Sequence, residues 1–400
     1  MFSVGRVLGV LGVGIVAAGC NSKASTNPIP DGFDHASLIR SWATDVIVPT
    51  YAALAVDARA LRDAVKSYQL ATASGSDERE QLLDEARQAW GTAMEQCQEA
   101  ELMQMGPAGP SGPTGLKGGE NLRDELYSWP TVSACRVDQE LVDGTYADTD
   151  FFERETVNAY GMDALEYLLF NEASAHSCPP QANLDDAWDA LGEEELTKRR
   201  ASYAASVAEH VLATAEELQA RWDPASGNFI EQFIQPGTGG SVYDNNRCVI
   251  DEVFASLFYI EFKVKDMKLG IPSGVRPECV ETQCPEAVES RWAKRSLENI
   301  RANYEGFERL FWGGEGGLGF DDYLIGIEAR DLEARMRLQF DSTISTLEAI
   351  PGPLADAVVN DDASVMAAYD ALKSLTDILK TEFVSKLSLR VPNEGDGDND

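Results

Sequence analysis

Two carboxylates inside an apolar run are the first sign of chemistry in this sequence. Asp163 and Glu166 lie in "YGMDALEYLLF", residues 160–170, and no other charged residue lies between Thr156 and Asn171. Their spacing of three places both side chains on one face of a helix. Since the other positions are apolar all round, we expect this helix to be buried. A buried carboxylate is costly unless it is protonated, paired or bound to a cation.

The helix that carries these acids is predicted to span residues 151–172. Asp150, followed three residues later by Glu153, is a suitable N-terminal cap, and "SAHSCPP" is a suitable stop. Gly161 then falls in the helix interior, where glycine costs about 1 kcal/mol relative to alanine. We therefore expect Gly161 to permit the close approach of another backbone.

Two further acids interrupt apolar stripes in the same way. Glu101 lies one turn beyond Cys97 on the stripe of the preceding helix, and Glu289 lies on the stripe that includes Ile300. An inward acid of this kind, taken singly, fits a salt bridge to a buried arginine or a helix cap. Three helices that each offer inward oxygen ligands are, however, the arrangement with which helical bundles bind metals. The hypothesis is a metal site formed by Asp163, Glu166, Glu101 and Glu289.

Helical periodicity dominates the chain, and strand signals are almost absent. Apolar residues recur at steps of three and four in six long segments, which are residues 38–70, 77–106, 195–222, 248–270, 287–312 and 363–389. The pattern predicts an all-α fold of two packed helical-bundle halves. The Pro- and Asp-rich stretch "HSCPPQANLDD" is the expected boundary between an N-terminal half, residues 33–178, and a C-terminal half, residues 179–390.

The N-terminus has the pattern of an export signal. One basic residue, Arg6, precedes an apolar stretch too short to span a bilayer. The stretch ends in "AAGC", which resembles a lipobox, so residues 1–19 are predicted to be cleaved and Cys20 to carry the lipid. A plain secretory signal or an uncleaved anchor is the alternative. Asn21 favours the outer membrane by resemblance to Gram-negative sorting rules, and residues 20–32 are expected to be a flexible tether.

The charge balance limits the partners of the protein. The formal net charge is −34, so nucleic acid and anionic lipid headgroups would be repelled. The balance is compatible with cation handling and equally with the solubility of an exported protein. The last residues, 391–400, form an acidic tail that is expected to be disordered.

Six cysteines follow Cys20, and an even number in an exported chain predicts disulfide bonds. The candidates are Cys97, Cys135, Cys178, Cys248, Cys279 and Cys284. The close pair in "ECVETQC" is the expected local bridge. Zinc binding is the weaker alternative, since the sequence has no C-x-x-C pair and no histidine close to this local pair.

The segment "GMDALEYLLF" resembles the signature of the imelysin-like family, which is Gly-x-His-x-x-Glu followed by Tyr-Leu-Leu. The segments "DVIVPTYAAL", "AWGTAMEQCQEAELMQMGP", "DMKLGIPSG" and "VESRWAKRSLENIRANYEGF" resemble family segments in the same order. The resemblance covers nearly the whole mature chain. It implies an exported, often lipid-anchored, all-helical protein of two bundle-like halves. It also implies a role in bacterial iron uptake, and the family is named after a member described as a protease.

The resemblance implies site residues position by position. Gly161 and Glu166 stand where the motif has them, Glu101 precedes the family's Gly-Pro, and Glu289 with Ser290 forms its Glu-Ser pair. Asp163 departs from the motif, which has histidine there. This departure resembles the iron-regulated subgroup of the family, in which that histidine is not always kept. A second carboxylate makes a harder, more anionic site that favours Fe(III), Ca²⁺ or Mn²⁺. It also removes the neutral base that a protease would use.

Three functions follow as hypotheses. The first is an outer-membrane lipoprotein that faces the periplasm, binds iron and serves an uptake system. The second is a metallopeptidase, although the sequence has no H-E-x-x-H, no G-x-S-x-G, and only His35, His176 and His210 as histidines. The third is a structural lipoprotein whose inward acids pair with Arg136 or with another buried base.

Overall fold

The computed structural model describes residues 32–112 and 116–389, and within them every regular element is helical. The first nine α-helices are α1 (His35–Ser41), α2 (Val48–Ser74), α3 (Arg79–Ala100), α4 (Leu122–Leu126), α5 (Ala134–Asp143), α6 (Phe151–Arg154), α7 (Met162–Phe170), α8 (Asp185–Trp222) and α9 (Phe229–Ile234). The others are α10 (Asn246–Leu257), α11 (Ser296–Trp312), α12 (Phe320–Gly326), α13 (Arg330–Glu348), α14 (Leu354–Asn360), α15 (Asp362–Ile378) and α16 (Val384–Leu387). The expectation of an all-α fold is confirmed.

Short segments of other helix types connect these helices. The π-helical segments are η1 (Trp42–Ile47), η7 (Ile260–Gly270) and η9 (Leu379–Phe383). The 3-10 segments are η2 (Glu101–Met103), η3 (Gly106–Ala108), η4 (Thr145–Ala147), η5 (Val157–Ala159), η6 (Pro180–Ala182) and η8 (Pro285–Ala287).

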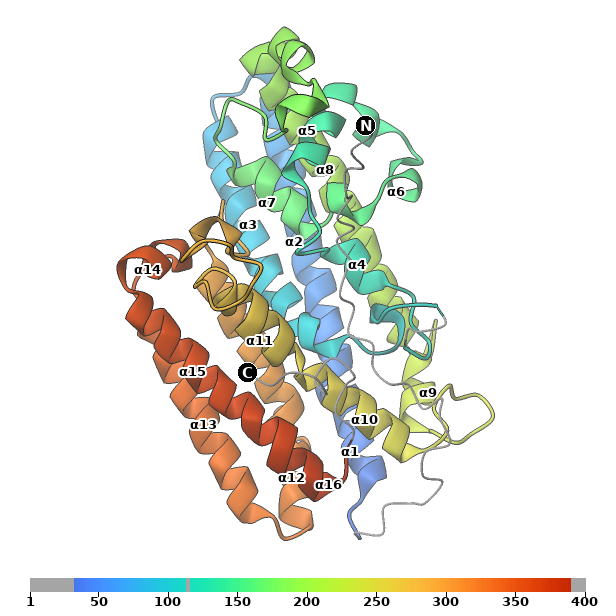
Figure 1. Cartoon of the computed structure of the whole chain (residues 1–400). Helices are drawn as coiled ribbons and strands as arrows, with labels where there is room; N and C mark the ends of the chain where they lie inside the picture. Colours follow the sequence, from blue (N-terminus) through green and yellow to red (C-terminus); the bar gives the residue numbers. More distant parts are fainter. Residues whose placement is uncertain (1–31, 113–115, 390–400) are drawn as a thin grey trace, which may run out of the picture.

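The first half of the molecule is built on α2, α3, α7 and α8. Helix α2 packs against both α8 and α3, and α7 packs against α8 (Figure 1). The buried residues of α2 recur at steps of three and four, so one face of this helix is apolar. They include Leu54, Ala58, Leu61 and Val65. Gly75 ends the helix with φ +67, a left-handed conformation that glycine adopts without strain.

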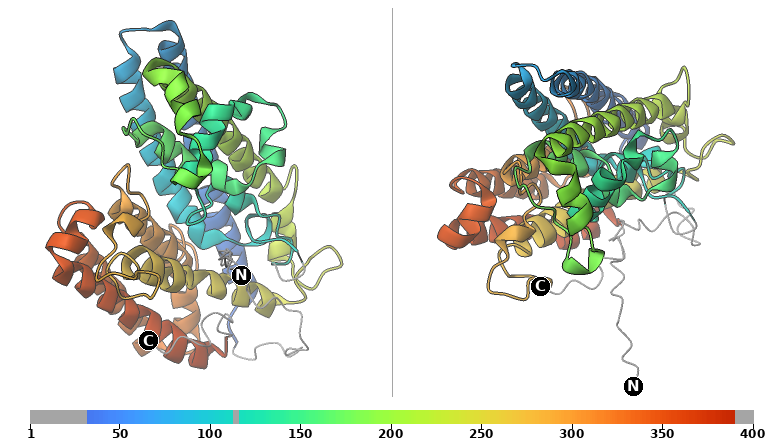
Figure 2. Two further views of the ribbon diagram at one scale, coloured as in Figure 1. Left: turned by 45° about the horizontal axis from the view of Figure 1, so that its top comes forward. Right: turned by 90° about the horizontal axis from the view of Figure 1, so that it is seen from above.

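The second half consists of η7, α11, α13 and α15, with α14 beside α15. Figure 2 shows its orange and red helices on one side of the molecule and the blue and green helices on the other. Helix α11 joins the halves because it packs against α3 as well as η7. The contact is close at Gly306, where a Cβ atom would lie 2.5 Å from the carbonyl oxygen of Glu99.

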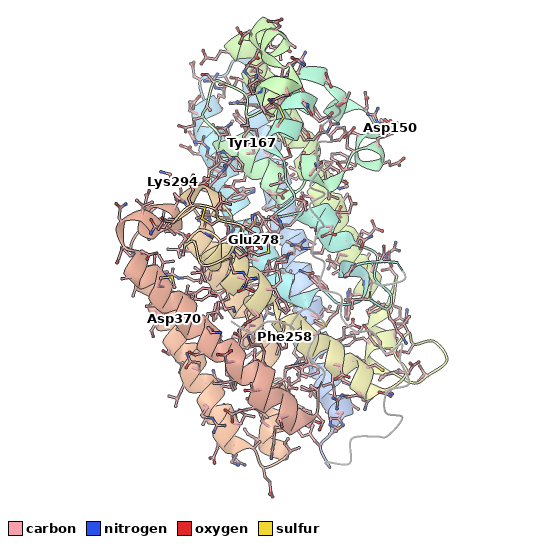
Figure 3. All side chains as sticks on the ribbon, in the orientation of Figure 1. Asp150, Tyr167, Phe258, Glu278, Lys294 and Asp370 are labelled. Carbon is pink, nitrogen blue, oxygen red and sulfur yellow. A yellow bond between two sulfur atoms is a disulfide. The ribbon has the colours of Figure 1, made fainter. Side chains whose placement is uncertain are left out.

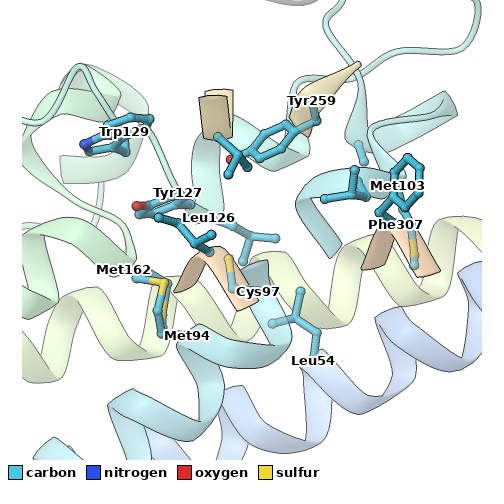
Figure 4. Packing of buried hydrophobic residues seen from close by; sticks show 14 of the residues in the cluster. Leu54, Met94, Cys97, Met103, Leu126, Tyr127, Trp129, Met162, Tyr259 and Phe307 are labelled. Atoms are coloured by element: carbon cyan, nitrogen blue, oxygen red, sulfur yellow. The ribbon is translucent and has the colours of Figure 1, made fainter. Parts of the chain in front are cut away.

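One apolar core runs through both halves. Figure 4 shows Met94 and Cys97 of α3 near Met162 of α7, with Phe307 of α11 in the same cluster. Two packed bundle halves are therefore confirmed. The predicted domain boundary near residue 178 stays a prediction, and α8, which follows it, packs along α2 of the first half.

The helix predicted for residues 151–172 is wrong. The chain instead forms α6, then η5, and then α7, which begins at Met162. The chain leaves the helical conformation at Glu155, and α7 starts only after Gly161, whose φ of 97° and ψ of −176° place it in a region that is open essentially to glycine alone. Gly161 is thus the N-cap of α7 rather than an interior residue.

The helix predicted for residues 287–312 is also too long. Helix α11 begins at Ser296, and Lys294 just before it has φ +58. Glu289 therefore lies in a loop, and its predicted place on a helical stripe is wrong. Glu101 likewise falls in η2, because α3 ends at Ala100, before the predicted stop at Gly106.

The cysteines partly follow the expectation. Cys279 and Cys284 form the predicted local disulfide, and Cys135 pairs with Cys178. Cys248 is a disulfide cysteine as well. Cys97 is a buried free thiol, so its place among the disulfide candidates is wrong.

Several predictions concern parts of the chain that are not described. The leader, the lipid-attachment residue Cys20 and the acidic tail 391–400 lie outside the described residues, as does the tether except for Gly32. Within the described ranges, no helix combines the length and the apolar composition needed to cross a membrane.

Candidate cation site

The start of α7 fixes the first candidate ligand. A Cβ atom on Gly161 would lie 3.0 Å from the carbonyl oxygen of Leu126, so α7 begins against the end of α4. The indole nitrogen of Trp90 donates a hydrogen bond of 2.8 Å to the carbonyl oxygen of Met162. These contacts hold the first turn of α7 deep in the first half, and the next residue is Asp163.

Asp163 is buried, with 3% of its surface exposed. Ser128 Oγ donates to Asp163 Oδ2 at 3.0 Å, and the backbone N–H of Ala164 donates to Oδ1 at 2.9 Å. Burial raises the pKa of Asp163 to about 7, although these hydrogen bonds oppose the rise.

Glu166 lies one turn further along α7 and is 2% exposed. The backbone N–H groups of Trp292 and Ala293 each donate to Glu166 Oε1 at 2.9 Å, and Ser290 Oγ donates to Oε2 at 3.1 Å. The loop before α11 therefore wraps the carboxyl group from the other half of the molecule. Burial raises the pKa of Glu166 to about 8, and the charge of Glu289 adds to the rise.

The loop is held against α7 by ring packing as well. The rings of Tyr167 and Trp292 meet edge to face with centroids 4.9 Å apart. Figure 3 shows Tyr167 and Lys294, which follows this loop, in neighbouring parts of the two halves. The donors to Glu166 are thus positioned by the interface between the halves.

Glu101 is paired with a partly buried cation. The guanidinium of Arg123 on α4 meets the carboxylate with both arms, Nε to Oε1 at 2.8 Å and Nη2 to Oε2 at 2.6 Å. The hydroxyl of Tyr259 donates to Oε2 at 2.8 Å. Such a paired geometry satisfies both partners within the protein.

Glu289 is also paired with a buried cation. Lys268 Nζ lies 2.9 Å from Glu289 Oε1, and neither side chain is exposed. Tyr127 OH donates to the same oxygen at 2.5 Å, and Asn299 Nδ2 donates to Oε2 at 3.1 Å. Lys268 comes from η7, a π-helical segment of the kind often found at functional sites.

The four acids therefore divide into two kinds. Glu101 and Glu289 each contact a cationic side chain, whereas Asp163 and Glu166 form no ion pair among the described residues. Residues 32–112 and 116–389 contain no group of three or more His, Cys, Asp or Glu side chains able to hold a metal ion. A single ion shared by all four acids does not fit this arrangement, and metal binding at these residues stays a prediction.

The cations Lys268 and Arg123 were not predicted from the sequence. Lys268 continues the line of buried residues Ile260 and Val264 at steps of four, as Glu101 continues the line of Cys97. The same test applied to lysines would have found it. Arg123 gives no comparable signal, because it lies in a five-residue helix.

Arg136, which the third hypothesis paired with the inward acids, has other partners. Arg136 pairs with Glu140 and Glu155 instead of any candidate ligand. The histidines also interact elsewhere, with His176 Nε2 3.0 Å from Asp185 and His210 Nε2 3.2 Å from Glu125.

A cavity of about 780 Å³ lies at the other end of α7. Leu168 and Leu169 line it together with Arg87 and Arg200, which donate to backbone carbonyl groups at the end of this helix. None of the four candidate acids lines this cavity.

The chain belongs to the imelysin family, because a family model described as Imelysin matches residues 47–379. The curated protein "Iron-regulated protein A" of Synechococcus elongatus is 23% identical over 392 residues, which cover 94% of this chain and 91% of that protein.

Two solved structures share the fold. One is described as a candidate precursor of iron-regulated protein A from Parabacteroides distasonis, with a TM-score of 0.64 and 18% identity over 92% of this chain and 97% of that one. The other is an imelysin-like protein from Psychrobacter arcticum, with a TM-score of 0.63 and 16% identity over 89% of this chain and 96% of that one.

Proposed function

We propose that this protein has an iron-related role in the cell envelope, in which Asp163 and Glu166 bind a cation. The observation that carries the proposal is their burial without a compensating charge, beside two acids that each have one. Iron is the cation suggested by the family and by the name of the curated relative.

The donor atoms around the two carboxyl groups are oxygens, which a hard cation prefers. Asp163 and Glu166 supply carboxylate oxygens, and Ser290 Oγ supplies a hydroxyl oxygen beside Glu166. Asn299 donates through Nδ2 to this hydroxyl at 3.1 Å, while its buried Oδ1 has no hydrogen-bond partner. A buried carbonyl oxygen without a donor is a suitable ligand for such an ion. Two carboxylates and neutral oxygens fit a cation site.

In such a site the carboxyl groups of Asp163 and Glu166 would contact the cation, and neighbouring residues would orient these groups. In the absence of a cation, the pKa values of about 7 for Asp163 and about 8 for Glu166 favour the uncharged, protonated form of both carboxyl groups below neutral pH. A bound cation would take the place of these protons. Ser128 and the loop 290–293 hold the two carboxyl groups in fixed orientations through their hydrogen bonds.

We also propose that the protein is anchored in the cell envelope. Cys20 would carry a lipid that anchors the chain in the outer membrane facing the periplasm, and an iron-uptake system would be its partner. Detergent phase partition of the full chain and of Cys20→Ser tests the anchor. The proposal requires that the wild-type chain partition with detergent and that the variant move to the aqueous phase.

Direct binding tests the metal site. Fe(II) under anaerobic conditions and Mn²⁺ are titrated into the purified protein and into the double variant Asp163→Asn with Glu166→Gln. Glu252→Gln is the matched control, because Glu252 is a buried acid whose pKa burial raises to about 7 and which accepts from Tyr243 OH at 2.7 Å.

We expect binding to be lost in the double variant and kept in the control. Equal affinity in the double variant would remove Asp163 and Glu166 as the site. Cleavage of an unfolded protein substrate, if it is sensitive to chelator and lost in Glu166→Gln, would replace the binding function by the metallopeptidase alternative.

A further inference from the structure

Two cationic side chains, Arg123 and Lys268, lie among the four buried acids Asp163, Glu166, Glu101 and Glu289. This inference rests on the proposed function. Arg123 meets Glu101 with both arms of its guanidinium, and Lys268 meets Glu289. Lys268 Nζ also lies 2.7 Å from Gln98 Oε1 and 2.6 Å from Asn303 Oδ1.

The hydrogen bonds around Lys268 favour its protonated form. Gln98 Nε2 donates to Glu289 at 3.0 Å, and Asn303 Nδ2 donates to the carbonyl oxygen of Gln98 at 2.8 Å. Both amide oxygens are therefore turned toward Lys268. Together with Glu289 Oε1 they present three acceptors, and only an ammonium group has three protons to donate. These acceptors and the charge of Glu289 favour the ammonium form of Lys268, although burial lowers the pKa of this side chain.

We propose that this site selects divalent over trivalent cations, and that the Lys268 ammonium sets the preference. Four ionised carboxylates carry −4, and Arg123 with Lys268 carries +2, which leaves −2. A divalent ion bound to Asp163 and Glu166 makes the buried region neutral, whereas a trivalent ion leaves it with an uncompensated positive charge. Uncompensated charge is costly away from water.

This preference differs from what the second carboxylate alone suggested. The replacement of histidine by Asp163 favoured a hard ion such as Fe(III), because only the ligand itself was considered. The count changes once Lys268 and Arg123 are included, since the charges of the Arg123–Glu101 pair act on Lys268 and the charge of Arg123 acts on Asp163. The cargo is then an ion of the class of Fe(II) or Mn²⁺.

An unpartnered oxygen supports a ligand in this region independently of the charges. Asn299 Nδ2 donates to both Glu289 Oε2 and Ser290 Oγ at 3.1 Å, so the amide cannot turn around without facing its oxygen to the Glu289 carboxylate. Its Oδ1 is consequently fixed, is buried and has no donor. Ser290 connects it to Glu166 through a hydrogen bond of 3.1 Å.

The test compares the affinities for Mn²⁺ and for Ga³⁺, a trivalent ion without redox chemistry, in one chelator buffer at fixed pH. Lys268→Met changes the net charge from −2 to −3, and Glu289→Gln changes it from −2 to −1. The double variant Lys268→Met with Glu289→Gln keeps −2 and is the matched control. Circular dichroism confirms that each variant is folded.

We expect the Ga³⁺ to Mn²⁺ affinity ratio to rise about tenfold in Lys268→Met, to fall in Glu289→Gln, and to stay near the wild-type value in the control. If Lys268→Met does not fold, the fall in Glu289→Gln carries the test. A wild-type preference for Ga³⁺, or a ratio that does not change in the folded single variants, would overturn the inference and leave the proposed site intact. Failure of the wild-type protein to bind either ion would overturn the proposed function itself, and this inference with it.

Discussion

Two pairs of buried acids in this protein have opposite surroundings. Glu101 and Glu289 are each paired with a cationic side chain of the protein, Arg123 and Lys268 respectively. Asp163 and Glu166 accept only neutral donors, and their pKa values rise to about 7 and about 8. The difference shows that burial of an acid does not itself indicate a cation site. What distinguishes a candidate ligand is the absence of a compensating charge.

The pH dependence of stability should separate the two pairs most strongly. The folded pKa values of Asp163 and Glu166 lie above their ordinary values of 3.8 and 4.5, so the folded state holds more protons between these limits. The free energy of unfolding is then largest below pH 4 and falls as the pH rises toward 8, by about 1.4 kcal/mol per pH unit for each group. Urea unfolding from pH 5 to pH 8, without metal, measures this slope.

The variants assign the slope to its residues. The double variant Asp163→Asn with Glu166→Gln should lower the slope of the unfolding free energy with pH by the contribution of two groups. Glu252→Gln should lower it by the contribution of one group, because the pKa of Glu252 is raised to about 7. A double variant with the full wild-type slope would show that Asp163 and Glu166 are already ionised in the folded protein, which contradicts the comparison.

Removal of a built-in cation should destabilise the compensated pair. Arg123→Met leaves Glu101 buried without a compensating cation, and we expect a loss of about 3–5 kcal/mol in the free energy of unfolding at pH 7. Arg59→Met is the control, because Arg59 pairs with Glu216 on the surface and should lose less than about 1 kcal/mol. Equal losses in urea unfolding would mean that the burial of the Glu101 pair has no energetic consequence.

The turn before α7 should show a smaller effect. Gly161→Ala places a side chain in a conformation that costs about 1–3 kcal/mol, and its Cβ would press on Leu126 O at 3.0 Å. Gly192→Ala is the control, since Gly192 has a positive φ as well but nothing within 4 Å. We expect a lower melting temperature for Gly161→Ala than for the control. The reverse order would show that the approach of α4 to α7 does not constrain the site.

The periodicity of the sequence was sufficient for the fold but not for its breaks. Long stripes such as that of α2 are determined by local spacing, so the helices and their inward faces could be predicted. The conformation of Gly161 and the loop around Glu289 depend on partners distant in sequence. Gly161 meets Leu126, and the loop donates to Glu166, and neither contact leaves a local pattern.

The candidate site was predicted in the same partial way. The inward positions of Asp163 and Glu166 followed from their helix, and both are buried. The cationic partners of Glu101 and Glu289 could not be assigned from the sequence. Arg123 lies 22 residues from Glu101 in the chain, and Lys268, the partner of Glu289, comes from η7. Pairing of this kind is a property of the tertiary structure.

Proton release on metal binding is the most direct test of the central claim. Titration of Fe(II) or Mn²⁺ into the apo protein at pH 6.5, in two buffers of different ionisation enthalpy, counts the protons displaced for each ion bound. The account predicts between one and two protons for the wild-type protein, because Asp163 and Glu166 hold them before binding, and no binding in the double variant Asp163→Asn with Glu166→Gln. Binding without proton release, or unchanged binding in the double variant, would contradict it.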